Sequence, residues 1–110
     1  MAIKINGTDM KDAVIKTEQF EMRILEFVPE RIRLSITDIS GDPFNFVPRF
    51  FEVVYPDRTV KVRANAGIVA VGARRTIQQT LQMEERLTIQ LFDRMQLRYA
   101  GKRIADVSVE

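Results

Sequence analysis

The strongest constraint on the fold is the alternation of apolar and polar residues in the segment Arg31–Ile39, which is strict from Arg31 to Thr37. Successive side chains of a β-strand point to opposite faces of a sheet, so this alternation predicts a half-buried strand. The segment Phe20–Ile24 alternates in the same way, and Val28–Glu30 contains a proline that is typical of a turn. The sequence therefore predicts a long β-hairpin. Its inward-facing apolar residues are expected to include Ile32, Leu34 and Ile36.

The alternation of the first strand slips at Leu25, because Ile24 and Leu25 are both apolar. A one-residue slip of this kind predicts a β-bulge, or a strand that switches sheets.

Two further hairpins are expected. One joins Phe50–Tyr55 to Thr59–Arg63 through a turn that contains Pro56, a residue that pre-sets φ for the first turn position. The other joins Met95–Tyr99 to the segment that follows Gly101, which can supply the positive φ of a tight turn.

In the segment Thr76–Leu91 a helix competes with strands, because its glutamine, leucine, methionine and glutamate residues have good helix propensity. The alternation of its apolar residues favours two strands joined by a turn at Glu84–Arg86. A short helix between 76 and 92 stays open as the alternative. The apolar residues all occupy odd positions: Ile77, Leu81, Met83, Leu87, Ile89 and Leu91.

We expect residues 1–110 to form a single all-β domain, since one core suffices for a chain of this length. The hairpins and three weaker runs give about nine to eleven short strands, a spacing typical of an antiparallel β-sandwich or a small barrel. The weaker runs are Ala2–Asn6, Ala13–Thr17 and Gly67–Ala73.

The chain contains no cysteine and no histidine. This composition excludes disulfides, zinc fingers, thiol nucleophiles and every catalytic triad that uses imidazole as its base. The carboxylates are spread over strand faces and turns without a pair suited to acid–base catalysis. We therefore expect no catalytic residues, no cofactor and no metal: the protein is predicted not to be an enzyme.

The N-terminal residues contain no apolar run of signal-peptide length, and no stretch of the chain is apolar enough to span a membrane. The sequon-like Asn6–Thr8 is interpreted as a turn. We expect the protein in the cytoplasm or in a virion, without a membrane partner.

Net charge is only +2, but it is unevenly distributed. Residues 1–57 carry seven basic and ten acidic side chains, whereas residues 58–110 carry ten basic and five acidic ones. A basic surface is one hypothesis for contact with nucleic acid, although contact with protein subunits is favoured. The candidate basic residues are Arg58, Lys61, Arg63, Arg74 and Arg75.

The tripeptide Asp38–Ser40 resembles the Asp-x-Ser motif of PilZ domains, β-barrels that bind cyclic di-GMP. That family's motif continues to a glycine where this chain has Pro43, and it needs two upstream arginines where only Arg23 is found. On the basis of this partial resemblance, the alternative function is a cytoplasmic β-barrel module that binds a nucleotide or nucleic acid.

The stretch Pro43–Phe51 and Tyr55 hold five of the nine aromatic residues within twelve positions. Aromatic side chains anchor both cores and interfaces, and prolines argue against a regular central strand. Phe44 and Phe46 either close one end of the sandwich or dock into a neighbouring subunit. The candidate interface residues are Phe44, Phe46, Pro48 and Arg49.

The N-terminal segment Ala2–Met10, with its Ile-Lys-Ile-Asn-Gly run, resembles the opening strand and turn of small bacteriophage tail and head–tail structural proteins. This resemblance implies a β module of a virion, in a tail, a neck or a capsid decoration. The leading hypothesis is a structural protein that packs with copies of itself or with other subunits.

Overall fold

The computed structural model describes residues 1–110 as an all-β fold with a single turn of 3-10 helix at Pro48–Phe50. The strands of the first half are β1 (Ile3–Ile5), β2 (Thr8–Asp9), β3 (Ile15–Lys16), β4 (Phe20–Val28), β5 (Arg31–Asp38) and β6 (Phe44–Phe46). Those of the second half are β7 (Phe51–Val54), β8 (Thr59–Lys61), β9 (Val69–Val71), β10 (Thr76–Gln82), β11 (Arg94–Tyr99) and β12 (Lys102–Val109).

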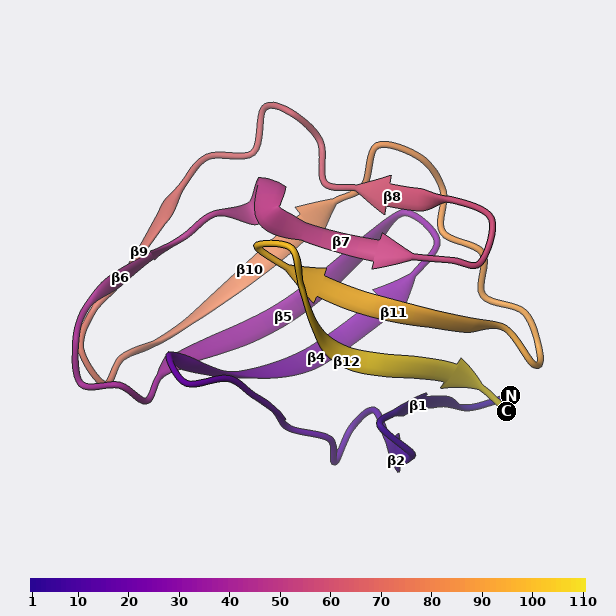
Figure 1. The fold of residues 1–110 in the computed structure, drawn as a ribbon, viewed down its shortest axis with the longest axis horizontal. Helices are drawn as coiled ribbons and strands as arrows, with labels where there is room; N and C mark the ends of the chain where they lie inside the picture. The colour runs from indigo at the N-terminus through magenta and orange to yellow at the C-terminus, as the bar shows by residue number, and fades with distance from the viewer.

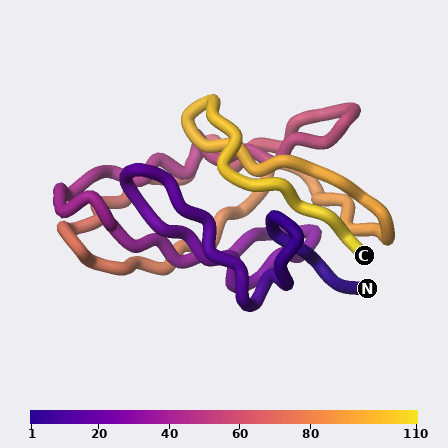
Figure 2. Tube along the Cα trace, turned by 60° about the horizontal axis from the view of Figure 1, so that its bottom comes forward, coloured from indigo at the N-terminus to yellow at the C-terminus, as the bar shows by residue number.

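A six-stranded antiparallel sheet has the order β2-β1-β12-β11-β7-β8. Its tight turns use residues with positive φ, Asn6 and Gly7 between β1 and β2, and Ala100 and Gly101 between β11 and β12. Both turns were expected from the sequence. The ends of the chain lie side by side (Figures 1 and 2), because Ala2 and Glu110 exchange two backbone hydrogen bonds of 2.6 and 2.8 Å.

A four-stranded antiparallel sheet has the order β10-β5-β4-β3 and contains the predicted long hairpin β4–β5. The register of this hairpin shifts between Ile24 and Glu26, and both halves of β4 pair with β5. The irregularity at Leu25 is therefore a bulge, and the strand does not switch sheets. Strands β4, β5 and β10 run behind β7, β11 and β12 in Figure 1.

The inward faces of the two sheets form one core of 25 buried apolar residues. Ile32, Leu34 and Ile36 are all fully buried, as the alternation predicted. A separate ribbon of β6 and β9 lies at one end of the molecule (Figure 1) and adds Phe46 and Val71 to the same core. The architecture is sandwich-like with no closed barrel, so the barrel alternative is excluded.

The segment that follows β10 corrects one prediction. Thr76–Gln82 is a strand, as favoured over a helix, and Met83 forms an isolated bridge with Val62. Residues 87–91 were expected to form a second strand but have no regular structure. The reason is that the Tyr55 side chain occupies both backbone groups of Thr88, which a strand would need for its ladder.

Candidate functional site

The aromatic residues of the stretch 43–51 gather around Tyr99 on β11. Phe46 is fully buried, and its ring stacks on that of Tyr99 with 5.1 Å between centroids. The Tyr99 hydroxyl accepts a 2.9 Å hydrogen bond from the amide of Val47, and burial raises the pKa of Tyr99. Phe44 stacks on Phe20 at 5.8 Å. This cluster closes one end of the sandwich.

Of the two alternatives for Phe46, the burial of this cluster supports the one in which the ring closes one end of the sandwich. Phe46 has no exposed surface and Pro48 is also buried in this fold, and their part in a subunit contact stays a prediction. Phe44 and Arg49 are half-buried, and their part in a subunit contact stays a prediction.

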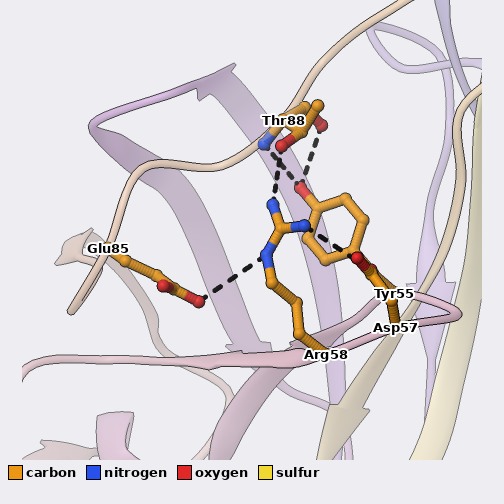
Figure 3. A network of polar contacts seen from close by, with 5 residues as sticks. All are labelled: Tyr55, Asp57, Arg58, Glu85 and Thr88. Atoms are coloured by element: carbon orange, nitrogen blue, oxygen red, sulfur yellow. Dashed lines mark hydrogen bonds and ion pairs between the residues drawn. The ribbon is translucent and has the colours of Figure 1, made fainter.

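A polar network holds the irregular segment after β10 against the β7–β8 hairpin (Figure 3). The buried Tyr55 hydroxyl donates to the Thr88 carbonyl (2.9 Å) and accepts from the Thr88 amide (3.0 Å). Arg58 lies over the Tyr55 ring, 4.3 Å from its centroid, and donates to Thr88 Oγ1 (2.6 Å). Its guanidinium also lies 3.5 Å from Asp57 and 3.6 Å from Glu85. Burial raises the pKa of Tyr55, and Arg58 serves the fold rather than an open cationic surface.

The other predicted basic residues lie in two groups rather than in one patch. Lys61 and Arg63 flank the end of β10, where Arg63 N–H donates to the Gln82 carbonyl (2.9 Å). Arg74 and Arg75 precede the start of β10. A seven-residue strand separates the groups by roughly 20 Å. The five residues therefore do not form one continuous track for a phosphate backbone.

The carboxylate of Asp38, the first residue of the PilZ-like tripeptide, is almost completely buried. It accepts hydrogen bonds from the amides of Arg74 (2.9 Å), Gly41 (3.0 Å) and Ser40 (3.2 Å), and from the Ser40 hydroxyl (2.6 Å). These bonds, that from Arg74 foremost, hold the pKa of Asp38 below its ordinary value. The carboxylate thus fastens the β5–β6 turn to the residues before β10. Arg74 itself has a positive φ of 59°.

A shallow groove of about 820 Å³ lies on the solvent face of the six-stranded sheet. Its polar lining includes Asn6, Arg94, Gln96 and Asp106, all exposed. Asn6 already accepts a hydrogen bond from the Asp106 amide (2.8 Å). The one lining residue with a shifted pKa is Tyr55, whose hydroxyl is already paired with the Thr88 backbone. No unpaired buried polar atom or acidic cluster marks this groove as a binding site for a small molecule.

An exposed apolar turn stands out instead. The turn Gln90–Asp93 precedes β11 and is closed by a 2.9 Å hydrogen bond from the Asp93 amide to the Gln90 carbonyl. Its two central residues, Leu91 and Phe92, are 51% and 80% exposed. Phe92 has a φ of 71°, a left-handed conformation that this turn position normally reserves for glycine or asparagine.

The alternating pattern predicted a strand that includes Leu91, but it gave no role to Phe92. The available signal was the pair of adjacent large apolar residues directly before Asp93. The left-handed backbone at Phe92 could not be predicted from the sequence, because phenylalanine does not favour this conformation.

Comparisons with protein-family models, with curated proteins and with solved structures find no match to this chain. The structure has no group of three or more carboxylate, histidine or cysteine side chains arranged to hold a metal ion. None of its helices has the length and apolar character needed to cross a bilayer.

Proposed function

We propose that this protein is a non-enzymatic structural subunit that packs with copies of itself or with other subunits in a bacteriophage particle. The observation that carries the proposal is the turn with Leu91 and Phe92. A non-glycine residue in the left-handed region costs about 1–2 kcal/mol. A phenyl ring that is exposed to water adds no hydrophobic stabilisation to the isolated subunit. Phe92 combines backbone strain, which clusters at binding sites, with the exposed apolar surface that a contact would bury.

The N-terminal hairpin supports the virion assignment. Ala2–Met10 resembles the opening of small tail and head–tail proteins, and this segment forms β1, the Asn6–Gly7 turn and β2. Figure 1 places β1 beside the C-terminal strand β12, with which it pairs. Phe92 lies beside the end of β12, since its amide donates to the Val109 carbonyl (2.7 Å). The contact turn and the N-terminal strand are thus at the same end of the six-stranded sheet.

Sedimentation of the wild-type chain and of Phe92→Gly over a wide range of concentration tests the proposal. Glycine accepts a positive φ without steric cost, so the isolated variant keeps or gains thermal stability. Loss of the anchor should weaken association by about 2 kcal/mol or more, which is about thirtyfold in Kd.

The matched control is Ile68→Ser, which removes another exposed apolar side chain from the loop between β8 and β9. This variant should associate as the wild type does. A wild-type chain that stays monomeric at every concentration, or a Phe92→Gly chain that associates as tightly as wild type, contradicts the proposed self-assembly.

A further inference from the structure

Strand β10 has one free edge. It is the outer strand of the four-stranded sheet and pairs with β5 along its whole length, without a register shift. The Gln82 carbonyl points away from β5, because it accepts from the Arg63 amide. Backbone groups alternate between the two sides of an antiparallel strand. The N–H and C=O groups of Thr76, Gln78 and Thr80 therefore also face away from β5.

These edge groups are available for pairing. Thr76, Gln78 and Thr80 are exposed, and no backbone hydrogen bond joins their outward groups to another strand. The one partner on this edge is the Gln79 carboxamide, which donates to the Gln78 carbonyl (3.0 Å). A flexible side chain of this kind can be displaced by an incoming strand.

The free edge has a defined length. At one end Arg63 already occupies the Gln82 carbonyl, and at the other the chain turns, with the Arg75 amide donating to the Gly72 carbonyl (3.0 Å). The open stretch Thr76–Thr80 has room for about five residues of an added strand.

The edge also lacks the features with which proteins usually prevent unwanted strand pairing. Such edges carry charged residues, proline or bulges. Strand β10 has the sequence Thr-Ile-Gln-Gln-Thr-Leu-Gln, with none of these and no glycine. Other outer strands, such as β2, β3 and β8, have only two or three residues, and each includes a charged one.

Charge at the two ends of the edge indicates which partner it suits. Arg74 and Arg75 lie before Thr76, and Arg63 lies beside Gln82; none of the three arginines has a carboxylate within ion-pair distance. Lys61 adds a cation at the Arg63 end, where its contact with Glu52 is a long 3.9 Å, and the exposed Glu84 offsets part of this charge.

This arrangement disfavours a second copy of the same strand. Two β10 strands paired antiparallel about Gln78 would bring Arg74 and Arg75 of each copy toward Arg63 of the other. Like charges placed together at an interface oppose association. An extended segment with acidic residues at both ends meets cations at both ends instead.

We propose that the free edge of β10 binds an extended, acid-flanked segment of a partner protein as an added β-strand. Main-chain hydrogen bonds to Thr76, Gln78 and Thr80 would hold the segment, and the flanking arginines would select its charge. The inference rests on the proposed role as an assembly subunit and assigns a second contact surface, distinct from the turn that carries Phe92.

The test uses the whole chain and a synthetic peptide with five alternating valine and threonine residues between acidic pairs. Residue-resolved amide exchange should show the Thr76, Gln78 and Thr80 amides exchanging fast in the free protein. At about 1 mM peptide they should become protected. A peptide with lysine pairs at its ends should bind about tenfold more weakly at low salt.

Protein variants separate pairing from charge. Gln78→Pro removes an N–H that faces the free edge and leaves the β5 ladder intact, so peptide protection should be lost. Arg63→Glu combined with Arg75→Glu should weaken binding about tenfold. This second variant keeps the test valid where the proline variant fails to fold. The matched control Arg94→Glu reverses an exposed arginine on the solvent face of the other sheet and should bind as wild type does.

Three results would overturn the inference. They are an unprotected edge at the highest peptide concentration, equal binding of the acidic and lysine peptides, and protection that grows with protein concentration alone, which would identify a second copy as the occupant. Sedimentation of Phe92→Gly distinguishes the two proposals. If that variant loses association while the edge binds no peptide, only the inference about β10 fails.

Discussion

Truncation of Phe46 to alanine tests the assignment of this ring to the core. Phe46 has no exposed surface and stacks on Tyr99. Full burial of a phenylalanine side chain is worth about 1.5–3 kcal/mol, and the stacked pair adds about 0.5–1.5 kcal/mol. With the cavity that alanine leaves, the free energy of unfolding should fall by about 3–5 kcal/mol.

A loss of this size is easily measured by thermal or urea denaturation. For a domain of about this length, 1 kcal/mol corresponds to about 4 °C in Tm, so Phe46→Ala should melt about 12–20 °C lower. Phe44→Ala provides the control, since Phe44 is half-buried and stacks only on Phe20. Its loss should cost about half as much.

Association should not change in this variant. Under conditions in which Phe46→Ala is still folded, it should give the same sedimentation profile as the wild type. Near-wild-type melting combined with lost association would refute the assignment, because it would mean that the ring contacts another molecule rather than its own core.

Three further changes test the fold. Leu34→Ala should cost about 2–5 kcal/mol in urea unfolding because Leu34 is fully buried, whereas Arg33→Ala should cost less than about 0.5 kcal/mol; equal losses would mean that the register of β5 is wrong. The folded-state pKa of Asp38 is lowered, so its stabilisation is present at neutral pH and is lost as the pH falls through that pKa; Asp38→Asn should therefore flatten the acid side of the stability profile, and an unchanged slope would contradict this. Tyr55→Phe removes the hydroxyl that pairs with both backbone groups of Thr88, so the free energy of unfolding should fall by about 1–3 kcal/mol. The Thr88 amide should also exchange faster, and unaltered exchange would contradict the two hydrogen bonds between Tyr55 and Thr88.

The sequence by itself determined the features that depend on near neighbours. Alternation in Arg31–Thr37 indicated that Ile32, Leu34 and Ile36 of β5 are buried, because the side-chain period of a strand is two wherever the strand lies. The turns at Asn6–Gly7 and Ala100–Gly101 follow from the asparagine and the two glycines, which tolerate positive φ. The bulge at Leu25 follows from a local break in the same pattern.

Only the tertiary structure decided features that depend on residues far apart in the chain. Phe46 is buried because Tyr99, 53 positions later, stacks on it, and the alternating residues after Arg86 form no strand because Tyr55 occupies the backbone of Thr88. The exposed Phe92 and the free edge of β10 were also out of reach of the pattern. Alternation specifies which face of a strand is buried, but the order of strands in a sheet, and hence which edge stays open, is set by packing across the whole core.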